Sequence, residues 1–119
     1  MAELFLPRSP VVEDRNLTAA VGTGSTAILA CPIRVTGLYE VSLYWTVTTA
    51  ATTLTVTVTY TDPTSGAQTL TPVDAVSEPV GAGSTRVGVV AAAGTTLTVT
   101  ATAGTADQIT LSAAVLAAR

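Results

Sequence analysis

The sequence of 119 residues contains no histidine, and all five of its basic residues are arginine, so lysine is absent as well. Charged residues make up 11% of the chain, whereas an ordinary soluble domain has about 25%. The arginines are scattered and form no basic cluster: Arg8, Arg15, Arg34, Arg86 and Arg119. Because nucleic-acid binding needs a basic patch and usually stacking aromatic residues, the sequence argues against a nucleic-acid partner.

The shortage of titratable groups also argues against catalysis. General acid–base chemistry needs a group that titrates near neutral pH, or carboxyls with separated pKa values. Besides one thiol and three tyrosines, the candidates are Glu40, Asp62, Asp74, Glu78 and Asp107. Most of these acids lie in apparent turns, where aspartate usually bonds its own backbone. No calcium-binding loop and no phosphate-binding loop before a helix is recognisable, so we expect no enzyme activity, no cofactor and no metal.

Cysteine, aromatic residues and long apolar runs are equally scarce. Cys31 is the single cysteine, so no intrachain disulfide can form, and we expect a small buried hydrophobic side chain. No run of about 18 apolar residues is present, which excludes a membrane-spanning helix. Of the aromatic residues, the strand alternation described below places Tyr39, Trp45 and Tyr60 inward and leaves Tyr44 pointing outward.

What the sequence does contain is a strong alternation of apolar and polar residues from Thr26 onward. Residues 52–60 place Leu54, Val56, Val58 and Tyr60 on one face and only threonine on the other. The segment 37–47 alternates in the same way, and 96–102 repeats the threonine pattern. A period of two residues is typical of a strand with one buried face. The last segment, 109–117, also alternates, which favours a strand over a short helix.

Turn signals divide this region into seven or eight strands. Gly37 and the sequence Asp62-Pro63-Thr64-Ser65-Gly66 each interrupt a strand, and residues 81–84 are interpreted as another turn. In the segment 26–35, alternation places Ala27, Leu29, Cys31, Ile33 and Val35 on one face, while Pro32 confines the strand to a sheet edge or a bulge. We therefore predict an all-β fold, an antiparallel β-sandwich or jelly roll of seven to eight strands.

Residues 1–25 lack this alternation and contain two prolines and a cluster of charges. We interpret them as an extended N-terminal arm and linker, and residues 26–119 as the β-sandwich domain. Within the arm, Leu4, Phe5, Leu6 and Pro7 form an apolar cluster beside Arg8. An exposed apolar cluster often marks an interaction site, so these five residues are the candidate partner-binding segment, and a frayed terminus is the alternative.

The threonine faces also bear on association. A solitary β-sandwich normally protects its faces and edges with charged residues, but between Ala50 and Ala103 the charges are Asp62, Asp74, Glu78 and Arg86 alone. A solvated threonine-rich surface is one explanation. Burial against further copies of the same chain is the other, and we favour it because symmetric homo-oligomers commonly cover such surfaces.

Four stretches resemble a known family. They are GLYEVSLY at 37–44, VTTAA at 47–51, YTD at 60–62 after the threonine–valine strand, and AAAGTTLTV at 91–99. In this order they resemble tailed-bacteriophage virion proteins, namely the small β-sandwich or jelly-roll modules of capsid decoration proteins, head fibres and tail appendages. The resemblance covers residues 26 to 118. The sequence lacks the large extra domain of the longer members, which favours a compact capsid-surface protein.

The resemblance implies a structural, non-enzymatic role in the virion. The implied protein decorates the capsid surface as a homotrimer and stabilises the shell by binding the major capsid protein, with the arm residues Leu4, Phe5, Leu6, Pro7 and Arg8 lying on the shell or on a neighbouring subunit. An alternative is a head-fibre or tail appendage that binds host-surface carbohydrate through Tyr44, or through Trp45 if the alternation is shifted by one residue.

Overall fold

The computed structural model describes residues 11–48 and 51–117. Its strands are β1 (Val11–Ala20), β2 (Thr26–Pro32), β3 (Gly37–Val47), β4 (Thr52–Asp62), β5 (Gly66–Glu78), β6 (Gly81–Ala91), β7 (Thr96–Ala103) and β8 (Ile109–Ala117). The described residues contain no helix, and accordingly no helix in this part of the chain is long and apolar enough to cross a membrane.

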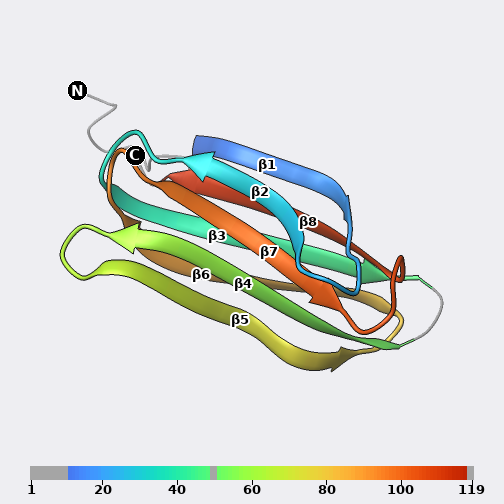
Figure 1. Cartoon of the computed structure of the whole chain (residues 1–119). Coiled ribbons are helices and arrows are strands. Elements are labelled where there is room, and N and C mark those ends of the chain that lie inside the picture. The colour runs from blue at the N-terminus through green and yellow to red at the C-terminus, as the bar shows by residue number, and fades with distance from the viewer. Residues whose placement is uncertain (1–10, 49–50, 118–119) are drawn as a thin grey trace.

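The strands form two antiparallel sheets that pack face to face (Figure 1). Sheet A has the order β1-β8-β3-β6 and sheet B has the order β2-β7-β4-β5. Strands from the two halves of the chain pair in reverse order: β1 with β8, β2 with β7, β3 with β6 and β4 with β5. A long hairpin rolled into two layers produces this pairing, which is the eight-stranded jelly roll. The predicted antiparallel β-sandwich or jelly roll is therefore confirmed.

The threonine-rich strands supply the core through the side chains that alternate with threonine. In β4, Leu54, Val56 and Val58 are fully buried, and in β7 the same holds for Leu97 and Val99. Successive side chains of a strand point to opposite faces, so every buried aliphatic residue places a threonine on the outside. One sequence pattern thus builds the core and the outer face of sheet B together.

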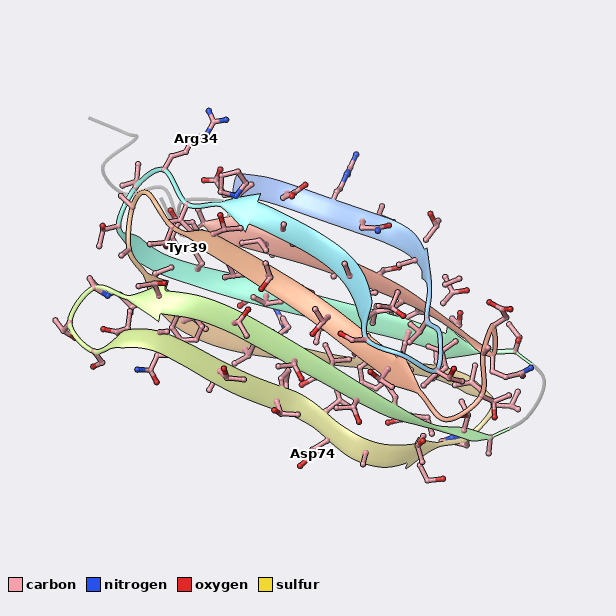
Figure 2. The ribbon with its side chains drawn as sticks, in the orientation of Figure 1. Arg34, Tyr39 and Asp74 are labelled. Carbon is pink, nitrogen blue, oxygen red and sulfur yellow. The ribbon has the colours of Figure 1, made fainter. Side chains whose placement is uncertain are left out.

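The aromatic side chains lie where the alternation predicts. Tyr39 is 2% exposed and lies between the two sheets, whereas Arg34 and Asp74 point away from the sandwich (Figure 2). The Tyr39 hydroxyl donates a hydrogen bond to the carbonyl of Val35, so its polar end is satisfied. Trp45 is also buried, and Tyr60 is half-buried against the core. Tyr44, predicted to point outward, is 49% exposed.

Residues 11–20 differ from the expectation of an arm, because they form β1 at the edge of sheet A. β1 pairs with β8, but its register shifts between Val12 and Asp14 and again between Asn16 and Ala19. Each shift inserts an unpaired residue and reverses the alternation of the strand. Because of the two shifts, apolar and polar residues do not alternate along this part of the sequence, although the segment is extended and paired.

A register shift also corrects the predicted face of β2. Ile28 is buried at 4% exposure, whereas Ala27, which was predicted to face the core, is exposed. Val35, also predicted to face the core, is exposed because it lies in the loop beyond the end of β2 at Pro32. The shift lies between Ala27 and Leu29. Because a one-residue insertion moves the preceding side chains to the opposite face, the alternation read through the whole segment is wrong before the shift.

The prediction of a turn at residues 81–84 is wrong, since these residues begin β6 and pair with β3. Gly81 lies opposite Val47 and Gly83 lies opposite Trp45. A Cβ atom at Gly83 would lie 2.6 Å from the indole ring of Trp45. The glycine therefore provides space for the tryptophan beside it, which is a packing role for glycine within a strand.

Candidate functional site

The arm residues predicted to bind a partner, Leu4, Phe5, Leu6, Pro7 and Arg8, lie outside the described residues, so their role stays a prediction. The chain enters the described part at Val11, where β1 begins opposite Ala117 of β8. Ala117 also lies opposite Tyr39 of β3. The arm therefore precedes one particular end of sheet A, the end at which β3 begins and β8 finishes.

The outer face of sheet A is apolar at this end. Leu38 and Val90 lie directly opposite each other on β3 and β6, and they are 56% and 43% exposed. Val12, which is 50% exposed, lies opposite the half-buried Leu116. Leu116 in turn lies opposite Glu40 of β3, two residues from Leu38. We call Val12, Leu38, Val90 and Leu116 the apolar end.

A second apolar feature lies further along the same face, around the exposed Tyr44. The ring borders a shallow hollow of about 130 Å³ lined by Leu17, Ser42, Tyr44, Ser112, Ala113 and Ala114. The Ser112 hydroxyl donates a 2.6 Å hydrogen bond to the carbonyl of Leu17, which fixes the bulged part of β1 at the rim. Four of the six lining residues are serine or alanine, and the two large ones are Leu17 and Tyr44.

The outer face of sheet B has a different character, and we call it the threonine face. Three pairs of threonines lie directly opposite each other on β4 and β7: Thr55 with Thr102, Thr57 with Thr100, and Thr59 with Thr98. Their flanking strand β2 contributes the exposed residues Ala27, Ala30 and Pro32. Outward positions of β2, β7 and β4 before Asp62 therefore carry no charge.

Several hydroxyl groups of the threonine face are already bonded within the chain. The hydroxyls of Thr59 and Thr98 form a hydrogen bond with each other. The Thr55 hydroxyl accepts a 3.0 Å bond from the backbone N–H of Ala75, which has a positive φ of 50° in the irregular part of β5. Such bonding leaves methyl groups as a large part of what this face offers to a partner.

The candidate acids do not form a site together. Asp62 is occupied in its own turn, where its carboxylate accepts hydrogen bonds from the Thr64 hydroxyl at 2.7 Å, the Thr64 N–H at 2.8 Å and the Ser65 N–H at 3.1 Å. Gly66 closes the turn with a φ of 82°. The prediction that turn aspartates bond their own backbone is confirmed here. No group of three His, Cys, Asp or Glu residues in residues 11–48 and 51–117 could hold a metal ion.

The turn at Asp62 makes part of the stability dependent on pH. The Thr64 hydroxyl, followed by the two N–H groups, lowers the pKa of Asp62 below its ordinary value of 3.8. A lowered folded-state pKa stabilises the fold above the ordinary pKa, and this contribution is lost as the pH falls through the lowered value. We expect Asp62→Ala to be less stable than wild type at neutral pH, with a deficit that shrinks as the pH falls below 3.8. Urea unfolding over a pH series measures this.

Thr64→Val is the matched control for this prediction, because it removes the hydroxyl that contributes most to the lowered pKa. Its pH dependence should lie between those of wild type and Asp62→Ala. A deficit of Asp62→Ala that stays constant from neutral to acidic pH would contradict the assigned role of the carboxylate.

Cys31 is fully buried and forms no disulfide, as expected. Burial is the main cause that raises the pKa of its thiol, and the nearby carboxylates of Asp14 and Glu13 add to this. The neutral thiol is a poor nucleophile. Cys31 packs in the core between the two sheets.

Sequence reasoning missed most of the exposed apolar residues of sheet A. Val12 and Leu17 lie in the bulged strand β1, where no alternation marks an outward position. Val90 follows Val89 directly, and the alternation of that valine pair could not be assigned to a face. The pairing of β6 with β3 shows that Val90 faces outward, because Val90 lies opposite Leu38, which the alternation of β3 places on the outer face.

The two rolled sheets define a compact jelly-roll module. No protein-family model matches the sequence, and no curated protein matches it. Among solved structures, a structure of the infectious bursal disease virus Gx strain superposes with a TM-score of 0.55 at 12% identity. The VP2 subviral particle of the same virus gives 0.54 at 12%, and the Gt strain gives 0.53 at 13%.

Each of these likenesses covers 92% of this chain, but only 32–33% of the viral chain. The described chain therefore corresponds to about a third of the proteins that it resembles. At such low identity the likeness shows the fold alone: this chain has a jelly roll of the type found in those viral structures.

Proposed function

We propose that this chain is a non-enzymatic structural protein of a tailed-bacteriophage virion. In this proposal it decorates the capsid surface, binds the major capsid protein and stabilises the shell as a homotrimer. The sequence resemblance supports the phage assignment. The jelly roll is compatible with it, because viral capsid domains are among the common uses of this fold.

The observation that carries the proposal is the apolar end of sheet A, at the end of the sheet where β1 begins. Val12, Leu38 and Val90 are each more than two-fifths exposed at the end where β1 begins. The apolar arm residues 4–7 precede that strand by only a few positions. An exposed apolar surface of this kind marks an interaction site, and in this proposal the apolar arm residues bind the shell together with it.

Trimerisation adds to the strength of this contact. Fully burying one large aliphatic side chain stabilises a complex by about 1.5–3 kcal/mol, but each association also costs translational and rotational freedom. Three linked copies distribute that cost over three contacts and gain avidity. The weakly charged sheet faces are compatible with close packing of such copies against one another.

Deletion of residues 1–10 is expected to leave the jelly roll folded and to abolish binding to the shell. The reason is that the deleted part precedes β1 and includes the apolar arm. Binding is measured by co-sedimentation with empty shells of the virus's own major capsid protein, and folding by the urea unfolding midpoint. Unchanged occupancy of the shells after the deletion would contradict the role of the arm.

Two exposed positions test the surface itself. Leu38→Glu places a charge in the apolar end and should weaken shell binding at least tenfold. Val76→Glu is the control, because Val76 is 46% exposed on β5 of the other sheet. Equal binding by the two variants, or a wild-type protein that is monomeric and has no affinity for shells, would refute the proposal.

The second candidate function is carbohydrate binding by a virion appendage. The exposed ring of Tyr44 beside its hollow favours it, because sugars stack on exposed aromatic rings and need polar groups nearby. A glycan array with wild type and Tyr44→Ala decides the matter. Binding that is lost in the variant would support an appendage, and no binding would leave the capsid proposal.

A further inference from the structure

The edge strands of the two sheets differ in how well they are protected. An exposed edge recruits strands from other chains, and proteins block it with proline, bulges or charge. β2 contains Pro32 and a register shift. β5 contains Pro72, two register shifts and the positive φ at Ala75. β1 contains two register shifts and three consecutive charged residues.

The fourth edge strand, β6, has neither a proline nor a register shift, and its one positive φ, 127°, is at its first residue, Gly81. It pairs with β3 at all of its positions, from Gly81 opposite Val47 to Ala91 opposite Gly37, without a register shift. It contains no proline. Its single charge is Arg86, whose guanidinium lies 3.7 Å from the carboxylate of Glu40 on β3. That contact directs the charge over the sheet and away from the open edge.

The core is also incompletely covered along β6. Val41 and Leu43 of β3 are 0% and 1% exposed, whereas the residues opposite them on β6, Val87 and Thr85, are only half-buried. All four side chains point toward the interior. The open side of β6 therefore exposes part of the core together with unpaired backbone groups.

Gly88 adds an observation that the fold of one chain does not explain. It is exposed in the middle of β6, and a Cβ atom there would meet only the carbonyl oxygen of Tyr39, at 4.0 Å. Glycine weakens a strand unless something approaches it closely. Gly83 of the same strand has such a neighbour in Trp45, but Gly88 has none within the described chain.

We infer that β6 is a self-association edge, on which β6 of a second copy pairs antiparallel about a two-fold axis at Val87. A two-fold axis perpendicular to the sheet keeps the outer faces of both copies on the same side. Val87 then lies opposite Val87 of the partner subunit and closes the open side of the core. Sheet A becomes a continuous sheet through both copies.

Charge and space select this register. An axis at Arg86 would place two guanidinium groups directly opposite each other, which destabilises a sheet. The axis at Val87 places Arg86 opposite Gly88 of the partner subunit, so no like charge faces the guanidinium group. It also places Val90 of one copy beside Ser84 of the other, next to the exposed Tyr44.

This pairing goes beyond the proposed function, since it needs no shell. In the proposed virion it would join copies that belong to neighbouring trimers. Its tests use the purified full chain without shells. The pairing can therefore be refuted while shell binding is confirmed, and shell binding can be refuted while the pairing is confirmed.

Disulfide trapping tests the axis directly. Val87→Cys places two thiols opposite each other across an antiparallel pair, at a separation that a disulfide can span. We expect covalent dimers under mild oxidation. Wild type, with its buried Cys31, Thr85→Cys and the exposed loop variant Val35→Cys should form few. Cross-linking of Val87→Cys no greater than that of Val35→Cys would overturn the pairing, and preferential cross-linking of Thr85→Cys would overturn the register.

Two substitutions of opposite charge at Gly88 distinguish an effect on association from an effect on folding. Within one chain Gly88 lies opposite Glu40, so Gly88→Lys should stabilise the protomer and Gly88→Glu should destabilise it slightly. Across the proposed axis the neighbour is Arg86 of the partner subunit, and the signs reverse.

Sedimentation equilibrium should therefore show that Gly88→Lys raises the dimer dissociation constant about tenfold and that Gly88→Glu lowers it, because the axis repeats each charge contact twice. Shifts of the same sign in both variants, or no shift in either, would overturn the proposal. The deletion of residues 1–10 should leave the dissociation constant unchanged. A loss of dimer in that deletion would show that the arm, rather than β6, occupies the edge.

Discussion

Leu43→Ala is expected to destabilise the fold by about 3 kcal/mol, within the range of 2–5 kcal/mol for removing a buried leucine side chain. Leu43 is 1% exposed and lies in the central strand β3, opposite Ala113 of β8 and Thr85 of β6. Its neighbours in sheet A are small, so the side chain fills space that they cannot refill. A loss of this size is a large part of a domain's total stability of about 5–15 kcal/mol.

Leu38→Ala is the matched control, because it removes the same atoms from the same strand. Leu38 is 56% exposed on the outer face, so its loss should change the unfolding free energy by less than about 0.5 kcal/mol. Urea unfolding followed by the fluorescence of Trp45 measures both variants. Equal losses at the two positions would mean that β3 does not present its odd-numbered residues to the core.

Alternation alone predicted most of the architecture. The strands β3, β4, β7 and β8 are regular over their whole length, and each places the predicted residues in the core. A period of two residues has one interpretation when one face is buried. The turn at Asp62 was equally clear, because proline, aspartate and glycine occupy positions that suit a tight reversal.

The edge strands were harder to predict, and the reason is physical. β1, β2 and β5 contain register shifts, and each shift reverses the alternation partway through a strand. Bulges occur preferentially at sheet edges, where they discourage pairing with other chains. The bulges that protect an edge strand therefore also interrupt the alternation from which the strand would be predicted.

The outer surfaces also differ in whether regular or irregular strands form them, and only surfaces on regular strands could be predicted. The threonine face could be predicted because β4 and β7 are regular central strands. The apolar end could not, since it combines Val12 from a bulged strand with Val90 from a strand whose alternation was ambiguous. A surface is assembled from strands far apart in the sequence, and only the register places its residues side by side.

Gly83→Ala is expected to destabilise the protein by about 2–3 kcal/mol, at the upper end of the cost of overpacking a core. The added Cβ would lie 2.6 Å from two atoms of the Trp45 indole and 2.7 Å from a third. Trp45 is 6% exposed, so the ring is confined and cannot move aside without disturbing its neighbours. Gly88→Ala on the same strand should have no such cost, because its Cβ meets nothing closer than 4.0 Å.

A double-mutant cycle identifies the cause. If the clash with the indole is the reason, Trp45→Leu should remove it, and Gly83→Ala should then cost less than about 0.5 kcal/mol in the Trp45→Leu background. The coupling energy is obtained from the unfolding free energies of wild type, the two single variants and the double variant. Unfolding is followed by far-ultraviolet circular dichroism, because Trp45 is absent from two of these proteins. Additive losses would show that Gly83 is required by the backbone of β6 rather than by the tryptophan opposite it. A strong coupling would establish that a glycine in an edge strand is retained here to seat a core side chain of the neighbouring strand.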